Sequence, residues 1–504
     1  MKTHVVFINP GFSLENSEII RRKNYNDFPL NLALLATHLL DKGYTSEIQN
    51  ANIHADWAER TLRALERTDV AYAGFSCMSS QVKSAIDLCK KIRERFPSLP
   101  IVWGGVHPTL LPETLVRTLW VDYCVVGEGD AVVEPLIDLA NGKIGVGEVP
   151  NLVYRKSDGS IGRTPKAPQT TFERLPTRMH ESLYRQDKEK YIAEIEIAGG
   201  RFRQFSVLTG LGCKYHCAFC INHVTRRAYR SKPASSIHQE MKFLKDNFGI
   251  NFFVFQEEHF FSDRSRLLEL LDLIERDGEL FGKIRWTTTV RVSDIREDYL
   301  DVSLLRRIAK AGCTGLGTGG ESGSDRVLKL LRKGTTRKDI LRAARFCNDA
   351  GLMLSFSFVM LWPGETPEEM SETAKLIDEI LRMGPYAHIP YFQTYRPYPG
   401  SIWEPDLSRF ENPESLPDDV WRFQMVDPDR VAAFPNPRHV YRMITTTQIL
   451  CLAGDIRRSS ARPVHKAIGD LLFHMCSLRI RRNDFRLFLE KPAYTFLRKR
   501  FSDF

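Results

Sequence analysis

The sequence predicts an α/β protein with two successive β/α regions and a mostly helical C-terminal region. Short apolar runs alternate with amphipathic helical patterns over residues 1–145, and the alternation resumes over residues 191–405. Between these regions, residues 146–190 are polar and rich in Gly and Pro, which is typical of a hairpin and linker. Over residues 406–504 the alternation gives way to helical, Arg-rich segments. We therefore expect two α/β domains joined by a linker and followed by helices.

The composition is that of a folded protein without a membrane span. Hydrophobic residues make up 43% of the chain and charged residues 26%, which excludes a disordered or fibrous protein. Pro10 breaks the apolar N-terminus too early for a signal peptide, and no apolar run is long enough to cross a membrane. We expect a cytoplasmic protein, in which clustered cysteines serve metal binding or catalysis more often than disulfides.

The first 145 residues predict a doubly wound, parallel sheet. Strand patterns at 4–9, 70–76 and 99–105 are separated by helical patterns at 30–43 and 82–96. Ligands of such sheets bind beyond the carboxyl ends of the strands, so a nucleotide-like ligand is expected there. The residues expected at those ends include Ser76, Ser79, Gly104, Gly105, Gly127, Glu128 and Gly129.

The second region predicts six β/α units. This number suits a barrel that is complete or nearly so, with its chemistry at the carboxyl ends of the strands. The six strands are expected at 205–210, 252–256, 284–290, 314–320, 354–361 and 389–395.

Three cysteines, Cys213, Cys217 and Cys220, follow the first strand of this barrel in a CxxxCxxC spacing. Glycines in the same loop allow the backbone to bring three thiolates together. Three thiolates can hold three irons of a [4Fe-4S] cluster and leave the fourth iron open for a small ligand. The alternative is a structural zinc site completed by His216 or His223, although zinc knuckles more often use paired CxxC loops.

The CxxxCxxC motif, with Phe219 before its last cysteine, resembles the signature of radical S-adenosylmethionine (SAM) enzymes. The resemblance implies that the open iron chelates the amino and carboxylate groups of SAM, with Phe219 beside the adenine. Further motifs of this family match in the right order over residues 205–405.

The resemblance assigns roles to residues that follow the later strands. Glu257 resembles the acidic residue that binds the methionine ammonium, where Asp is more usual. Arg291 resembles the residue that faces the substrate cavity and the methionine carboxylate. Glu321 and Ser322 resemble the pair that reaches the ribose and carboxylate, and Gly364 lies in a turn that flanks the adenine. Arg291 and Glu321 are the expected catalytic residues.

Residues 1–145 resemble the cobalamin-binding domain that precedes the barrel in a large branch of this superfamily. The matches are the helix that follows Pro29, Gly74-Phe75-Ser76, the segment 103–109 and the segment 126–130. Glycines there let the backbone approach the corrin edge and the nucleotide tail. The implied cobalamin contacts are Ser76, Ser79, Gly104, Gly105, Val106, Gly127, Glu128 and Gly129.

Two features bear on how this domain is used. The DxHxxG motif that supplies a lower-axial histidine in related domains is absent, so we read His54 as a surface or packing histidine and expect no protein His ligand. Cys77, Cys89 and Cys124 would be the cysteines of a second cluster in a methylthiotransferase, but their apolar surroundings indicate core positions. A degenerate module that keeps the fold and binds nothing is the other alternative.

The resemblance implies a methyltransferase that uses a [4Fe-4S] cluster, SAM and cobalamin to methylate an unactivated carbon of a small-molecule or lipid-like biosynthetic intermediate. Three alternatives are open: an oxidoreductase that closes or rearranges a ring without methyl transfer, a methylthiotransferase, and a non-catalytic cobalamin-binding protein. The expected partner is an electron donor such as flavodoxin or ferredoxin, with no nucleic acid.

The C-terminal region concentrates the basic charge. Twelve Lys and Arg residues stand between Arg457 and Arg500 against three acidic residues, an excess equal to the net charge of +9 of the whole chain. A helical cap on the barrel with a solvated basic face is the favoured interpretation. The alternative is a surface that attracts an anionic substrate or a membrane.

Overall fold

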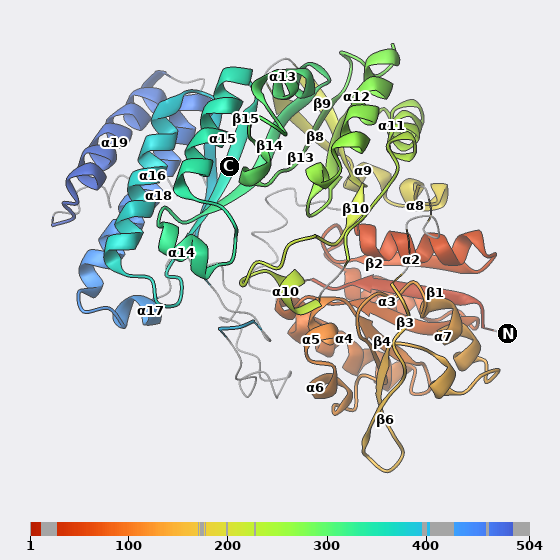
Figure 1. Ribbon diagram of the computed structural model, residues 1–504. Coiled ribbons are helices and arrows are strands. Elements are labelled where there is room, and N and C mark those ends of the chain that lie inside the picture. The colour runs from red at the N-terminus through yellow and green to blue at the C-terminus, as the bar shows by residue number, and fades with distance from the viewer. Residues whose placement is uncertain are drawn as a thin grey trace.

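The computed structural model describes residues 2–11, 28–169, 171, 176, 178–197, 200–225, 228–395, 401–403, 428–459 and 463–486. Residues 404–427 and 487–504 of the predicted C-terminal region, with the basic residues Arg498, Lys499 and Arg500, lie outside this part. Figure 1 shows two α/β regions, one coloured red to orange and one yellow to cyan, with blue helices against the second.

The first region is a seven-stranded sheet in the order β2-β1-β3-β4-β5-β6-β7. The first five strands run parallel, and the β6–β7 hairpin, which falls within the predicted linker, adds two antiparallel strands next to β5. The strands are β1 (His4–Asn9), β2 (Thr45–Asn50), β3 (Val70–Ser76), β4 (Ile101–Gly104), β5 (Tyr123–Val125), β6 (Leu152–Arg155) and β7 (Ile161–Arg163). The helices are α2 (Leu30–Asp41), α3 (Trp57–Ala64), α4 (Val82–Arg95), α5 (Val106–Leu110), α6 (Pro112–Val116) and α7 (Val133–Ala140).

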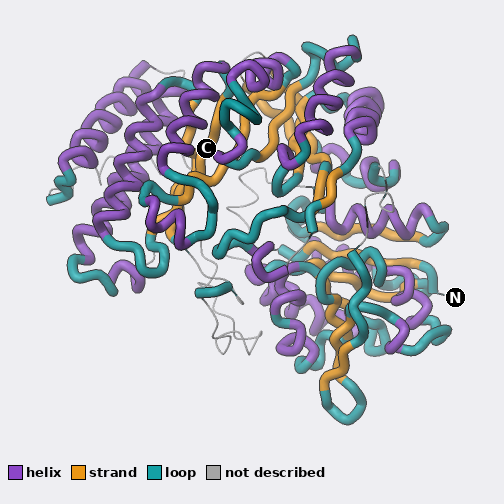
Figure 2. Tube along the Cα trace, viewed as in Figure 1, coloured by secondary structure: helices purple, strands orange, loops and turns teal. Residues whose placement is uncertain are grey.

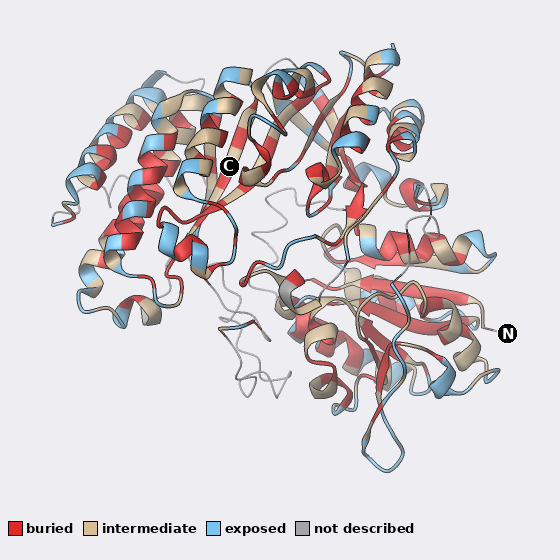
Figure 3. Ribbon diagram, in the orientation of Figure 1, coloured by how far each residue is buried: buried red, intermediate tan, exposed pale blue. Residues whose placement is uncertain are grey.

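Strand β1 shows why a continuous apolar run becomes a central parallel strand. Val5 and Phe7 pack into one buried cluster, while Val6 and Ile8 pack into another on the opposite face of the sheet. Helices cover both faces, so both sets of alternating side chains must be apolar. Figure 3 shows the resulting buried strands in red between partly exposed helices.

The second region is an open sheet in the order β16-β15-β14-β13-β12-β9-β8. Six strands are parallel, β8 pairs antiparallel with β9, and β8 and β16 form the two ends, which makes this a partial barrel as predicted. Figure 2 shows its strands as an orange layer behind purple helices. The strands are β8 (Ala193–Ile197), β9 (Gly200–Leu208), β12 (Phe252–Gln256), β13 (Arg285–Thr289), β14 (Cys313–Glu321), β15 (Met353–Met360) and β16 (Ala387–Thr394). The outer helices are α11 (Ala234–Phe248), α12 (Arg264–Arg276), α13 (Val302–Lys310), α15 (Arg337–Ala350) and α16 (Pro367–Met383).

The two regions pack on each other, and the linker helices α8 (Glu181–Arg185) and α9 (Lys188–Tyr191) lie at the same contact. The ring of Phe28, from the first region, lies 5.2 Å from the ring of Phe205 on β9 and 5.9 Å from that of Tyr184. This aromatic contact joins the two cores into one buried cluster.

The C-terminal helices are α17 (Pro428–Ala432), α18 (Pro437–Ser459) and α19 (Pro463–Arg482). Figure 1 shows α18 and α19 beside α16, at the end of the barrel that carries β16. Arg458 on α18 donates to the carbonyl of Ala387 on β16 at 2.6 Å. Among the described residues, no helix is both long enough and apolar enough to span a membrane.

Candidate active site

The three cysteines of the CxxxCxxC motif share one loop at the mouth of the barrel. The loop runs from β10 (Gly210–Leu211) to the short helix α10 (Ile221–Thr225). Cys217 is buried, and Cys213 and Cys220 are partly exposed; all three are free thiols. Burial raises the pKa of the Cys213 and Cys220 thiols, and the nearby thiol of Cys217 raises both further. The three thiols therefore lie close enough together to interact electrostatically.

The zinc alternative requires four ligands around one metal ion. No three His, Cys, Asp or Glu side chains within the described ranges are arranged to hold one metal ion. Zinc needs its ligands around one centre, whereas each cysteine of an iron–sulfur cluster binds its own iron and the thiols stand farther apart. The side chain of His223 lies outside the described part, and His216 is exposed.

Arg291 brings a positive charge to the cysteine loop. It begins the turn after β13, its guanidinium lies 3.6 Å from the centre of the Tyr215 ring, and its Nη1 is 3.5 Å from Cys217 Sγ. Its Nη2 also donates to the carbonyl of Lys333. Burial raises the pKa of the Cys213 thiol, and the charge of Arg291 opposes that shift; the thiolate is the form that binds iron.

Glu321 ends β14 in a conformation that glycine would normally occupy. Its φ is +62°, and its buried carboxylate accepts a hydrogen bond of 2.6 Å from Lys333 Nζ. Left-handed backbone in a non-glycine residue is uncommon and is often found at functional sites. Lys333 Nζ also lies 5.7 Å from the centre of the Phe219 ring, which ties Glu321 to the cysteine loop.

Ser322 points away from this group. It is fully buried, and its Oγ lies 3.2 Å from Thr373 Oγ1 on α16. The contacts of Ser322 are therefore those of a residue that holds the turn after β14 against a helix.

An aromatic group stands beside the cysteine loop at the end of β15. The rings of Phe219 and Trp362 are 5.3 Å apart. Gly364, two residues further on, has a φ of +73°, and no atom outside its chain neighbours lies within 4 Å of the position that a Cβ would take. Glu365 accepts a hydrogen bond of 3.0 Å from the Trp362 amide, and burial raises the pKa of its carboxyl to about 8.

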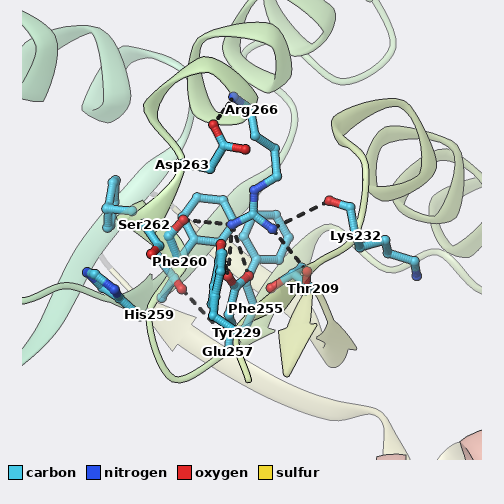
Figure 4. A network of polar contacts seen from close by, with 12 residues as sticks. Thr209, Tyr229, Lys232, Phe255, Glu257, His259, Phe260, Ser262, Asp263 and Arg266 are labelled. Carbon is cyan, nitrogen blue, oxygen red and sulfur yellow. Dashed lines mark hydrogen bonds and ion pairs between the residues drawn. The ribbon is translucent and has the colours of Figure 1, made fainter. Parts of the chain in front are cut away.

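Glu257 is engaged in a buried network, drawn in Figure 4. Arg266 Nη2 donates to both of its carboxylate oxygens, at 2.9 and 3.0 Å, and the Tyr229 hydroxyl donates at 3.0 Å. Glu258, next to it, is exposed and close enough to Cys213 to raise the pKa of that thiol. Of these two adjacent carboxylates the sequence singled out Glu257, and the interaction of Glu258 with Cys213 was not predicted.

Several buried polar atoms around this mouth have no hydrogen-bond partner in the described part of the chain. Buried polar groups are normally paired, so unpaired ones indicate a polar ligand that the protein itself does not supply. They are Arg291 Nε, Thr318 Oγ1, Thr335 Oγ1, Trp362 Nε1 and Glu365 Oε1.

The carboxyl edge of the first sheet carries the residues predicted to meet cobalamin. At the end of β3, Ser76 Oγ accepts a hydrogen bond of 2.6 Å from Asn31. Ser79 Oγ lies 2.9 Å from Nδ1 of His107, which is buried and whose pKa burial lowers to about 4. The proximity of His107 to Ser79 was not predicted from the sequence.

Three glycines at this edge differ in the space around their Cα atoms. Gly105, which precedes Val106 at the start of α5, has a φ of +97°, and a Cβ there would lie 2.9 Å from the Cys77 backbone. At Gly104 a Cβ would meet nothing nearer than 3.8 Å, and at Gly127 nothing within 4 Å. The backbone of Gly104 and Gly127 can therefore be approached closely by a ligand.

Glu128 and Gly129 face the second region and helix α2. The Glu128 carboxylate pairs with Arg230, which follows the cysteine loop. A Cβ on Gly129 would lie 3.3 Å from Leu35. Glu128 is thus a contact between the two regions.

His54 is a packing histidine. It is 5% exposed, its Nε2 lies 2.9 Å from Asp187 and its Nδ1 lies 3.0 Å from Lys190 Nζ. Both ring nitrogens are engaged with the linker.

Comparison with known proteins identifies both regions. The model of the radical SAM superfamily matches residues 207–377, and that of the B12 binding domain matches residues 20–137. An uncharacterized methyltransferase of Pyrococcus horikoshii is 25% identical over 382 residues, which are 75% of this chain and 78% of the relative. The anaerobic magnesium-protoporphyrin IX monomethyl ester cyclase of Rubrivivax gelatinosus is 25% identical over 441 residues, 84% and 75% of the two chains.

A solved structure shares the fold. The cobalamin-dependent S-adenosylmethionine radical enzyme OxsB, with aqua-cobalamin bound, superposes with a TM-score of 0.73 at 15% identity. The match covers 100% of this chain and 76% of OxsB. The arrangement of both sheets is therefore common to the two proteins.

Proposed function

We propose that this chain, which belongs to the cobalamin-dependent radical SAM enzymes, places a methyl group on an unactivated carbon of a small-molecule or lipid-like biosynthetic intermediate. Its cofactors are a [4Fe-4S] cluster, SAM and cobalamin. When bound, the cluster and SAM supply radical chemistry and cobalamin supplies the methyl group, while the protein positions the reactants and excludes water. The observation that carries the proposal is a methyltransferase relative that matches 75% of this chain, which itself has both cofactor domains.

In this proposal Cys213, Cys217 and Cys220 hold the cluster. Their shared loop and the guanidinium of Arg291 near Cys217 Sγ suit three thiolates. The unpaired Arg291 Nε and the aromatic pair of Phe219 and Trp362 are suited to SAM, which carries a carboxylate and an adenine.

Three carboxylates have separate roles in the proposal. Glu321, held by Lys333, lies on the SAM side of the barrel mouth. Glu258 is the carboxylate near the methionine ammonium, since both oxygens of Glu257 already accept hydrogen bonds from Arg266. Glu257 fixes the loop after β12, and Ser322 and Gly364 shape the turns around the adenine.

The cobalamin contacts proposed from the sequence lie along the edge formed by β3, β4 and β5. Gly104 and Gly127 leave room for a ligand against the backbone. Ser76 and Ser79 present hydroxyls, Gly105 and Val106 form the turn into α5, and Gly129 packs on α2.

The mass of the product tests this proposal. Anaerobically reconstituted protein is incubated with SAM, a reductant and metabolite extract of the source cells. A product heavier than its precursor by one methylene unit supports methyl transfer. A product that loses two hydrogens instead supports the second candidate, ring closure or another net oxidation, which the cyclase relative with 84% coverage of this chain favours.

The methylthiotransferase alternative finds little support in the first region. Cys77, Cys89 and Cys124 are fully buried in an apolar cluster, and burial raises the pKa of Cys89 to about 12 and those of the other two as well. Their place among apolar core side chains favours packing cysteines over ligands of a second cluster.

We further propose that this enzyme is cytoplasmic and takes electrons from a flavodoxin or ferredoxin. The C-terminal helices serve mainly as a cap, because Arg457 pairs with Asp470 at 2.5 Å and Arg458 with Asp455 at 2.8 Å. Association with a membrane surface through the basic tail is the weaker alternative.

A further inference from the structure

The strand β11 (Arg230–Ser231) closes the base of the cysteine loop. It pairs antiparallel with β10, with Leu211 opposite Arg230 and Gly210 opposite Ser231. The loop that carries the three cysteines therefore begins and ends in one small two-stranded ladder. Contacts that hold β11 in place therefore also determine the position of the cysteine loop.

Side chains in and around β11 engage carboxylates from three different parts of the molecule. The Tyr229 hydroxyl donates to Glu257, after β12, at 3.0 Å. Lys232 Nζ lies 2.5 Å from Glu240 on α11, and both side chains are almost fully buried. These two contacts anchor the segment in the barrel, next to the Arg266 network of Figure 4.

The contact made by Arg230 leads out of the barrel. Its Nη1 donates to Glu128 Oε2 at 2.8 Å and its Nη2 donates to Glu128 Oε1, so the pair is bidentate. The two side chains are only 11% and 16% exposed. A planar guanidinium bound to both oxygens of a carboxylate fixes angle as well as distance.

Glu128 is held on its own side as well. Its carbonyl accepts from Asn151 Nδ2 at 3.2 Å, and the preceding amide of Gly127 donates to Thr109 at 3.0 Å. The Gly127–Gly129 turn belongs to the carboxyl edge proposed to meet cobalamin. The Arg230–Glu128 pair therefore joins β11, at the base of the cysteine loop, to the Gly127–Gly129 turn, and hydrogen bonds hold each of these segments within its own domain.

We propose that the Arg230–Glu128 pair is a positioning contact that sets the separation and orientation of the cluster loop relative to the cobalamin edge. The inference rests on the proposed function, in which both cofactors act on one substrate carbon. Neither residue needs to touch a cofactor for this role. Removing one partner leaves a poorly solvated charge in the interface and releases the angle between the domains, and a misplacement of about 1 Å can cost about a hundredfold in rate.

The test measures the distance between the two cofactors in full-length, reconstituted protein without substrate. Pulsed electron paramagnetic resonance reports the dipolar coupling between cob(II)alamin and the reduced cluster. Wild type should give one narrow distance distribution. Arg230→Gln should broaden or shift it and Arg230→Lys should do so less, since Lys keeps the charge but not the bidentate geometry.

Two further variants separate this role from a general loss of charge. Arg201→Gln breaks an exposed ion pair with Glu196 on the same barrel and should leave the distribution unchanged. Glu128→Gln should resemble Arg230→Gln, and the double variant should be no broader than either single one, because both remove the same contact.

The iron and cobalt content of each variant shows whether it still binds the cluster and cobalamin. The proposal expects Arg230→Gln, Arg230→Lys and Arg201→Gln to keep both cofactors, with the amount of product per 5'-deoxyadenosine reduced by up to about a hundredfold in Arg230→Gln. An unchanged distribution in Arg230→Gln, or loss of cobalamin or cluster in that variant alone, would overturn it. Failure of the proposed methylation would instead appear in the wild-type product and would leave the distance measurement intact.

Discussion

Arg266 and Glu257 form a buried ion pair at the end of β12, in which one guanidinium nitrogen bonds both carboxylate oxygens at 2.9 and 3.0 Å. The same guanidinium donates to the carbonyls of Phe260 and Thr209, at 2.6 and 3.0 Å. This arrangement connects the loop after β12 with the strand that leads into the cysteine loop, so a single buried cation organises two segments of the candidate site.

Removal of this cation should destabilise the barrel. Arg266→Met leaves the buried Glu257 carboxylate without its counter-charge, which typically costs about 3–5 kcal/mol of unfolding free energy. Denaturant unfolding measures the change. The double variant Arg266→Met, Glu257→Leu should recover a large part of it, and a single variant as stable as wild type would contradict the interpretation.

The cysteine triad should carry one cluster of about four irons and four sulfides per chain. Replacement of Cys213, Cys217 and Cys220 by Ala should abolish iron binding and the visible absorbance of the reconstituted protein. Cys313→Ala, which alters a buried thiol in the core, is the matched control and should keep both. A full complement of iron in the triple variant would disprove the assignment of the ligands.

Cobalamin should bind without a histidine from the protein. His54 is held by Asp187 and Lys190, and the spectrum of the cob(II)alamin form should show no nitrogen superhyperfine splitting from the protein. Electron paramagnetic resonance of wild type and His54→Ala makes the comparison. Splitting that is present in wild type and disappears in the variant would show the expectation to be wrong.

Glu365 should make the stability of the protein depend on pH. Because burial raises its pKa in the folded state to about 8, the folded protein holds a proton that the unfolded chain releases at lower pH. The stabilising contribution is present below the carboxyl's ordinary pKa and is lost as pH rises through about 8. Glu365→Gln should flatten this dependence, by a few kcal/mol across the range; parallel pH profiles of the two proteins would argue against a protonated Glu365.

The C-terminal helices should not bind membranes, because Arg457 and Arg458 are paired with acidic residues within the fold. Co-sedimentation with anionic and neutral vesicles at several salt concentrations measures binding. The cap interpretation predicts no difference between the two lipids. The membrane alternative predicts binding to anionic vesicles alone, which weakens as salt rises. It also predicts weaker binding by the double variant Lys466→Gln, Arg482→Gln.

The parts of the fold with strong local patterns could be predicted from the sequence. The apolar runs of β1 and β3 and the alternation in β15 mark buried strands because both kinds of pattern follow from packing against helices. Strand β2, at the edge of the sheet, was not predicted, since TSEIQN is mainly polar: its first three residues are not buried, and Gln49 and Asn50 are polar although buried.

The candidate site was predictable only where its residues share one local motif. The cysteine loop, Arg291 and Glu321 come together at the barrel mouth, as the order of motifs indicated. The pairing of Arg230 with Glu128 spans 102 residues and joins two domains, so no local pattern contains it. The choice between Glu257 and Glu258 depends on Arg266, whose position on α12 the motif does not encode.

The fate of a labelled methyl group tests the central claim most directly. Reconstituted protein is supplied with SAM that carries a trideuterated methyl group, with and without cobalamin, and the product is analysed by mass spectrometry. We predict a product that contains the deuterated methyl group and forms only when cobalamin is bound. A product that forms without the label, or that forms equally well without cobalamin, would contradict the assignment of this chain as a cobalamin-dependent methyltransferase.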